Sequence, residues 1–216
     1  MNKGFYKQGS RGFIDLQLTE ADISEMQKYK RIKSFAISHL KVTNLDFLLL
    51  FPNLESVQFY GCTIADYTTL RKVSKLKLLF FNTIRTSNDN FNFLSHGFEN
   101  LEWLSISYCP KFEVFPNLSA CKNLKMLEIR RCKSLMEVQN IRKIPNLEGI
   151  SFSVYSKLEP SDLEFIIQMP DLKLISCYFP IKKQEQLFNE LCLKHGKTKD
   201  YDLVNDKDSP KFVRKI

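Results

Sequence analysis

The chain has 216 residues, 44% of them hydrophobic, and a formal net charge of +8. This length and apolar content favour one folded domain and argue against a disordered chain. The longest purely apolar run, FLLLF at 47–51, is far too short to span a bilayer, and the opening MNKGFYKQGSRGF lacks the apolar stretch of a secretory signal. We therefore expect a cytoplasmic protein that does not cross a membrane.

A short phrase of residues recurs along the chain. It is clearest in NLEWLSISYC at 100–109 and NLKMLEIRRC at 123–132, where a leucine follows the asparagine, further apolar residues stand three and five places later, and a cysteine ends the phrase. Frames of this kind begin at residues 13, 32, 54, 76, 101, 124, 147 and 172. Such regular self-similarity indicates a solenoid, in which each repeat buries its apolar side only against its neighbours.

The phrase resembles that of the leucine-rich repeat family, L-x-x-L-x-L-x-x-N/C-x-L, over residues 13–180. The resemblance implies an α/β fold, a solenoid with a curved parallel sheet on the concave side and short helices or 3-10 turns on the convex side. It further implies eight repeats and a small stand-alone protein of bacterial type. Relatives of this size include immunity proteins that neutralise a toxin, so the resemblance also implies a protein-binding function.

The connections between the phrases suggest where helices lie. The sequence predicts helices at 66–76 and 159–170, and a helix after Thr19, whose Thr-x-x-Asp pattern is related to the capping box. An apolar stripe before Gly196 predicts a helix that ends the solenoid. We expect a single domain at 1–196, comprising an N-terminal cap at 1–30, repeats at 31–180 and a C-terminal capping helix at 181–196. The charged tail at 197–216 is expected to be mobile.

The residue types that support catalysis or metal binding do not form a recognisable motif. The three histidines are widely spaced, and the six cysteines contain no C-x-x-C pair. Three of these cysteines occupy the same place in the phrase, which predicts buried structural thiols. We therefore expect a non-catalytic protein with no cofactor and no metal site.

The phrase also predicts a binding surface. Residues between the apolar slots should point onto the concave face, which is the usual binding surface of solenoids. In the first frame this places Phe13 in the core and Asp15 on the concave face. The middle repeats carry large side chains there, and two more follow the strands. The predicted partner-binding residues are Tyr60, Leu78, Phe80, Trp103, Tyr108, Met126, Glu128, Arg130 and Arg131.

Within this surface the sequence suggests distinct roles. Trp103, Phe80, Tyr60 and Met126 are the expected apolar anchors, because large aromatic side chains often dominate binding energy at protein interfaces. Arg130, Arg131 and Glu128 would set polarity and register. The positive net charge favours an acidic protein partner.

Charge supports an alternative partner. Seven Lys or Arg stand against two Glu in 121–143, and seven stand against four Asp in 194–216. Such basic segments can bind nucleic acid or another polyanion through its phosphates. The alternative function is therefore polyanion binding, and its mark would be a steep fall in affinity with added salt.

Overall fold

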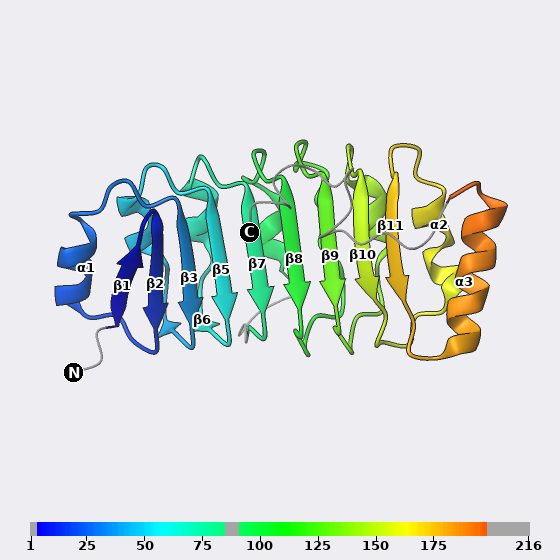
Figure 1. Ribbon diagram of the computed structural model, residues 1–216, viewed down its shortest axis with the longest axis horizontal. Coiled ribbons are helices and arrows are strands. Elements are labelled where there is room, and N and C mark those ends of the chain that lie inside the picture. The colour runs from blue at the N-terminus through cyan, green and yellow to red at the C-terminus, as the bar shows by residue number, and fades with distance from the viewer. Residues whose placement is uncertain (1–3, 85–90, 198–216) are drawn as a thin grey trace.

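The computed structural model describes residues 4–84 and 91–197. Its main feature is one nine-stranded sheet, in which neighbouring strands follow the order of the chain (Figure 1). The first pair is an antiparallel hairpin and every later pair is parallel. The strands are β1 (Phe5–Gln8), β2 (Arg11–Asp15), β3 (Ser34–Ser38), β5 (Ser56–Tyr60), β7 (Leu78–Asn82), β8 (Trp103–Ser107), β9 (Met126–Arg130), β10 (Gly149–Ser153) and β11 (Leu174–Tyr178).

The strand register confirms the predicted frame from residue 32 onward. Each phrase forms one strand, and the same place in every phrase lies opposite its equivalent in the next. Leu78 pairs with Trp103, for example, and Trp103 pairs with Met126. Neighbouring strands lie about 4.8 Å apart, so equivalent side chains of successive repeats form continuous columns across the sheet.

The frame predicted to begin at residue 13 is wrong by four residues. Asp15 pairs with Ser38 at the end of β3, and Phe13 lies opposite Ala36, on the face that turns away from the core. Ile14 is buried in its place. The ring of Phe13 stacks on Tyr6 of β1 at 4.6 Å, so the hairpin partner covers an aromatic residue that the phrase assigns to the core.

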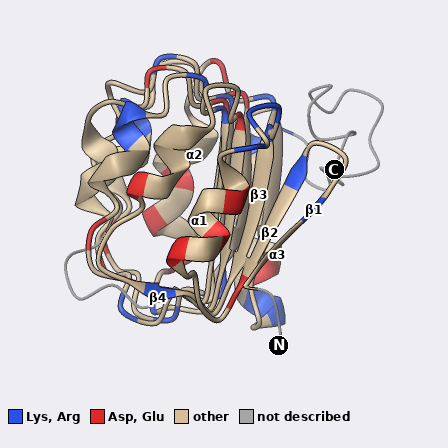
Figure 2. Ribbon diagram, turned by 90° about the vertical axis from the view of Figure 1, so that its left-hand side faces the viewer, with Lys and Arg blue, Asp and Glu red and all other residues tan. Residues whose placement is uncertain are grey.

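The helices cover the other face of the sheet, and Figure 2 shows the two layers from the β1 end. Most of them are short because few residues connect one strand to the next. They are α1 (Glu20–Met26), α2 (Glu164–Ile167), α3 (Lys182–Lys194) and the 3-10 helices η1 (Asp46–Leu50), η2 (Thr68–Lys72), η3 (Asn92–Ser95), η4 (Gln139–Lys143) and η5 (Pro160–Leu163). Strands β4 (Lys41–Val42) and β6 (Thr63–Ile64) form a small separate sheet.

The predicted helices form, in shortened versions. The helix expected at 66–76 is the 3-10 helix η2, and the one expected at 159–170 is η5 followed by α2. Thr19 caps α1 through the predicted capping box with Asp22. In the part of the chain that the structure describes, no helix combines the length and apolar character needed to cross a membrane.

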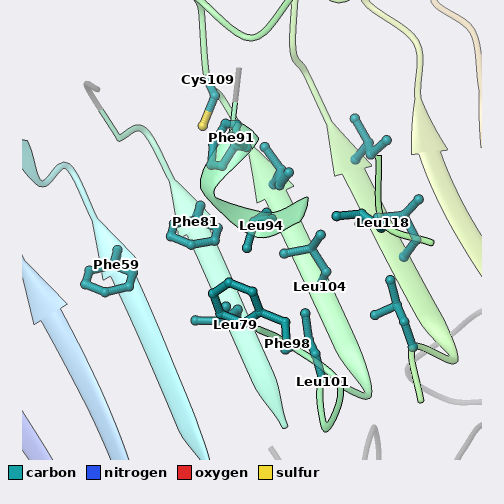
Figure 3. Close-up of a cluster of buried hydrophobic side chains, with 14 of the residues drawn as sticks. Phe59, Leu79, Phe81, Phe91, Leu94, Phe98, Leu101, Leu104, Cys109 and Leu118 are labelled. Carbon is teal, nitrogen blue, oxygen red and sulfur yellow. The ribbon is translucent and has the colours of Figure 1, made fainter. Parts of the chain in front are cut away.

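The core lies between the sheet and the helices. Phe59 and Phe81 stack at 5.4 Å, and Leu79, Leu101 and Leu104 pack beside them (Figure 3). The cysteines are buried as predicted. Burial raises the pKa of the Cys109 thiol to about 12 and that of Cys132 to about 11, so both remain neutral at pH 7. Because the thiolate is the reactive form, these side chains are packing residues.

Two sets of side chains join successive repeats. The amides of Asn100, Asn123 and Asn146, which open their phrases, each donate a hydrogen bond of 2.7–2.8 Å to a backbone carbonyl of the preceding repeat. The residue after the first apolar slot alternates in charge along the solenoid, as Lys33, Glu55, Lys77, Glu102, Lys125, Glu148 and Lys173. Salt bridges join Lys33 to Glu55, Lys77 to Glu102 and Lys125 to Glu148. We call this series the charge ladder.

The helix expected at 181–196 is α3, which follows the last strand (Figure 1). Phe188 is buried 5.6 Å from Phe179, and His195 Nε2 lies 2.9 Å from Glu164 Oε1 near α2. Gly196 has the positive φ of +66° that a helix end often requires. The cap at 1–30, the repeats at 31–180 and the capping role of 181–196 stay predictions, and residues 198–216 of the predicted tail lie outside the described residues.

Candidate interaction surface

The face of the sheet that turns away from the helices carries its own apolar cluster, separate from the core. We call this side the open face; it is the predicted concave face. Its apolar cluster consists of Leu78, Phe80, Trp103, Met126 and Leu174. The rings of Phe80 and Trp103 meet edge to face at 4.7 Å. The structure therefore brings together four of the predicted partner-binding residues and adds Leu174, which occupies the same column in the last strand.

A glycine shapes this cluster. Gly149 lies between Met126 and Leu174 in the sheet. A Cβ at Gly149 would lie 2.5 Å from Met126 Sδ and 3.2 Å from Leu174 Cβ. The missing side chain thus leaves the space that Met126 occupies. As a result, Met126 is only 1% exposed and Trp103 is 8% exposed, whereas Leu78 and Phe80 are half-buried.

A polar group borders the cluster in the middle of the open face. The Ser105 hydroxyl donates a hydrogen bond of 2.6 Å to Glu128 Oε2, and the Arg130 guanidinium forms an ion pair with the other carboxylate oxygen. Glu128 is 8% exposed. A carboxylate this deeply placed is stabilised by its partners, and the pair neutralises the charge of Arg130.

The chain leaves most strands through a left-handed turn. The residue after the strand has φ between +51° and +63° at Leu16, His39, Gly61, Thr83, Tyr108 and Arg131. Its backbone N–H donates to the last strand residue of the next repeat, as in Tyr108 N to Arg130 O at 2.8 Å. The left-handed conformation costs about 1–2 kcal/mol for a residue other than glycine. The ladder of hydrogen bonds offsets that cost and fixes where these side chains stand.

Two of these turn residues join a tyrosine–arginine cluster at the carboxyl ends of the strands. The Arg131 guanidinium lies between two rings, 5.4 Å from the centroid of Tyr108 and 5.2 Å from that of Tyr155. Tyr178 lies 6.0 Å from Tyr155, and the hydrogen bond between their side chains raises the pKa of Tyr178. We call Tyr108, Arg131, Tyr155 and Tyr178 the tyrosine–arginine cluster.

The predicted partner-binding residues include Tyr108 and Arg131 but not Tyr155 and Tyr178. Tyr155 stands where other phrases have their final cysteine, which is the signal that could have found it. In this repeat Val154 is buried, whereas Tyr155 stays partly exposed. The change of residue at that slot therefore supplies the second ring beside Arg131.

Tyr60 is not a member of the open-face apolar cluster. Its hydroxyl donates to Gln58 Oε1 at 2.8 Å, and Arg11 Nη2 donates to the same oxygen at 3.0 Å. The Arg11 guanidinium lies 5.1 Å from the ring of Phe13. These residues, with Tyr6, form a second aromatic group near the hairpin. The sequence missed it because the first frame was placed four residues too late.

The chain is similar to known leucine-rich repeat proteins. No family model matches the sequence. The chain is 26% identical over 141 residues to "Probable disease resistance protein RPP1" of Arabidopsis thaliana, covering 62% of this chain and 11% of that protein. Among solved structures, an internalin, InlF of Listeria monocytogenes, has a TM-score of 0.52 at 14% identity, with 83% of this chain and 51% of that chain covered.

TLR13 in the TLR13–ssRNA13 complex has a TM-score of 0.57 at 17% identity, with 77% of this chain and 28% of that chain covered. These neighbours, the recurring phrase and the parallel sheet agree. The chain has the leucine-rich repeat fold. It spans about half of the internalin's length and a much smaller share of the other two proteins. The likeness therefore concerns the fold and not the activities of those whole proteins.

Metal-ligating side chains are scattered over the described part of the solenoid. Among residues 4–84 and 91–197, no three His, Cys, Asp or Glu side chains gather as ligands. Grooves follow β4 and β6 and the side of η1, away from the open face. The chemistry that the described open face offers is therefore apolar contact, aromatic stacking and hydrogen bonding by guanidinium groups.

Proposed function

We propose that this leucine-rich repeat protein binds another protein on its open face, without catalysing a reaction. The observation that carries the proposal is the apolar cluster of Leu78, Phe80, Trp103, Met126 and Leu174, on the side of the sheet opposite the core. An apolar group rimmed by polar residues is typical of a protein-binding surface. The fold needs no second apolar cluster on that side, since each repeat already buries its leucines against the helices.

The predicted residues have different roles in this proposal. Phe80 and Leu78 are half-buried and offer contact area to a partner, while the more deeply buried Trp103 and Met126 pack beside them. Glu128, held by Ser105, positions Arg130 at the rim. A more specific form of the proposal is a cytoplasmic protein of the immunity or inhibitor type, whose partner is the protein it neutralises.

Polyanion binding through 121–143 and 194–216 is the rival. One structural neighbour is TLR13 in the TLR13–ssRNA13 complex, so nucleic-acid binding is tested as the alternative function. Lys and Arg are nevertheless distributed around the molecule (Figure 2). Within 121–143, Arg130 is on the open face, whereas Arg142 lies on η4 in the helix layer, over the ring of Phe165. These two basic residues of 121–143 therefore lie on opposite sides of the sheet, which favours a protein partner over a polyanion.

The test compares Phe80→Asp with a matched control. Phe80→Asp places a charge in the open-face cluster, while Leu193→Ser removes an apolar side chain that is 73% exposed on α3. Wild type and both variants are used as bait in nuclease-treated lysate of the source cell, after thermal unfolding has shown that all three are folded. We expect one protein to be retained by wild type and by Leu193→Ser and lost by Phe80→Asp, a loss of about 2 kcal/mol or more in affinity.

Two results would contradict the proposal. One is a partner that all three baits retain equally, because the binding surface would then lie elsewhere. The other is recovery of nucleic acid from untreated lysate by all three baits, with release at high salt. Salt-dependent release is the mark of phosphate contacts, whereas an aromatic interface weakens only modestly.

A further inference from the structure

The Arg131 guanidinium lies against two aromatic rings, and no acceptor for its N–H donors is found among the described residues. Its guanidinium lies between the rings of Tyr108 and Tyr155, at 5.4 and 5.2 Å from their centroids. No ion pair or side-chain hydrogen bond involves Arg131 within the described part of the chain. Two other arginines differ: Arg130 is paired with Glu128, and Arg142 donates to Gln139 at 2.9 Å.

This arrangement prepares the guanidinium for a planar acceptor. A guanidinium that contacts aromatic rings through its π system keeps its N–H groups available as donors to an acceptor. A carboxylate is the side-chain acceptor whose two oxygens match that edge. Because stacking already restricts the arginine side chain, binding there requires less loss of rotamer entropy than binding to a free arginine.

The backbone adds to this preorganisation. Tyr108 and Arg131 both have left-handed φ values, +54° and +51°, and their N–H groups bond to Arg130 O and Ser153 O of the next repeats. The direction of both side chains is therefore set by the turn rather than by a flexible loop. Tyr108 is 43% exposed and Tyr178 is 46% exposed, so the cluster is open to a large ligand.

The surrounding charge also favours an acidic ligand. Glu128 is occupied by Ser105 and Arg130, so Arg131 adds a positive charge that this carboxylate does not balance. Glu185 and Arg131 both act on Tyr178, and their charges shift its pKa in opposite directions. A negatively charged ligand is therefore favoured at the Tyr108 end of the cluster, away from Glu185.

We propose that the tyrosine–arginine cluster binds an acidic segment of the protein partner, with an Asp or Glu carboxylate received edge-on by Arg131 between Tyr108 and Tyr155. This inference rests on the proposed function and names the chemistry of the partner. The apolar cluster supplies contact area, and the tyrosine–arginine cluster, at the carboxyl ends of β8 to β11, selects for a carboxylate.

The experiment selects binders from a displayed library of random 12-residue peptides on the full chain. Four further baits are used: Arg131→Gln, Arg131→Lys, Phe80→Asp and the control Arg142→Gln, which alters another ring-stacked arginine in the helix layer. We expect peptides selected by wild type and by Arg142→Gln to be enriched in Asp and Glu. By fluorescence anisotropy, Arg131→Gln should weaken a selected peptide by about tenfold or more, the range of a charged hydrogen bond.

Arg131→Lys separates shape from charge. It keeps the positive charge but loses the planar, ring-stacked fork, so we expect it to lose most of the affinity that Arg131→Gln loses. A phosphorylated version of the same peptide is the second probe. We expect the unphosphorylated peptide to bind through its carboxylates alone, without needing the phosphate. An oligouridylate probe that binds wild type more tightly than the acidic peptides would overturn the inference in favour of RNA.

Other outcomes distinguish this inference from the proposed function. Selected peptides without acidic enrichment that are lost with Phe80→Asp but unchanged with Arg131→Gln would remove the inference and leave the proposed function standing. Acidic peptides that bind Arg131→Gln as well as wild type would also remove it. Acidic peptides lost with Arg131→Gln but retained by Phe80→Asp would support the cluster and argue against the apolar site. Failure to select any peptide counts against the inference.

Discussion

The two faces of the same sheet differ in how firmly their side chains are held. Leu104 points into the core and is fully buried among leucines and phenylalanines of several repeats. Its neighbour Trp103 points the opposite way and belongs to the small open-face cluster. Both residues are buried by exposed area, yet their surroundings are unlike. Burial alone therefore does not separate a residue that holds the fold from one that shapes a surface; the extent of the packed layer behind it does.

The largest expected effect tests this contrast directly. Leu104→Ala should lower the free energy of unfolding by about 2–5 kcal/mol, because it leaves a cavity in the core. Trp103→Ala should cost less than half as much, because the open face can close around the gap, and it should weaken partner binding. Urea unfolding of both variants measures the difference. Equal losses of stability would show that the open-face cluster is part of the core.

Glycines on the two faces give a second, smaller test. A Cβ at Gly12 would lie 2.2 Å from the ring of Phe35 in the core, whereas one at Gly149 would meet the flexible end of Met126. Gly12→Ala should destabilise the fold by about 1–3 kcal/mol through overpacking. Gly149→Ala should cost less than that, because Met126 can swing away. Thermal unfolding compares the two, and a larger loss for Gly149→Ala would contradict the idea of an adaptable open face.

The charge ladder lies at the amino ends of the strands, one residue before each begins, and its effect should be smaller still. Glu102→Lys would remove the pair with Lys77, at 3.0 Å, and set three lysines side by side in neighbouring repeats. We expect a loss of about 1 kcal/mol at low salt, because like charges opposite each other in a sheet are destabilising. The loss should shrink in 1 M salt. Urea unfolding at two salt concentrations checks this, with Glu99→Lys, outside the ladder, as the control.

The smallest expected effect concerns the attachment of α3 to the helix layer. The hydrogen bond from His195 lowers the pKa of Glu164, so the folded state favours the ionised carboxylate. Its contribution to stability is present above the ordinary pKa of glutamate and is lost as pH falls through the lowered value. The protection factors of the α3 amides, which correct for the intrinsic pH dependence of exchange, should therefore fall with acidity more in wild type than in Glu164→Gln. An identical pH dependence in both would show that this pair does not hold the helix.

Much of the fold was predictable because the repeat supplies the same evidence many times. Every frame from residue 32 onward places its strand correctly, since the alternation of inward and outward residues recurs in each phrase. The first frame failed because Phe13 is apolar yet faces outward, where Tyr6 of the hairpin covers it. The repeat pattern reflects how each repeat packs against its neighbours in the solenoid. It does not predict a strand that is added at the end of the solenoid.

The candidate site was predictable in outline only. Column positions brought Phe80, Trp103 and Met126 together correctly, because their spacing follows from the register. The deep burial of Met126 depends on Gly149 one strand away and Leu174 two strands away, which no single phrase reveals. The tyrosine–arginine cluster depends on left-handed turns at Tyr108 and Arg131. Tyrosine and arginine have no preference for the left-handed conformation, so the sequence does not predict such a turn.

The alternating charges limit how this solenoid can change in length. Lysine and glutamate take turns at equivalent places in successive repeats from Lys33 to Lys173. Loss or duplication of one internal repeat would leave two like charges adjacent, whereas loss or duplication of two would preserve the alternation. The unit that can be copied without electrostatic penalty is therefore a pair of repeats. A lengthened relative built on the same ladder is expected to differ from this chain by an even number of repeats.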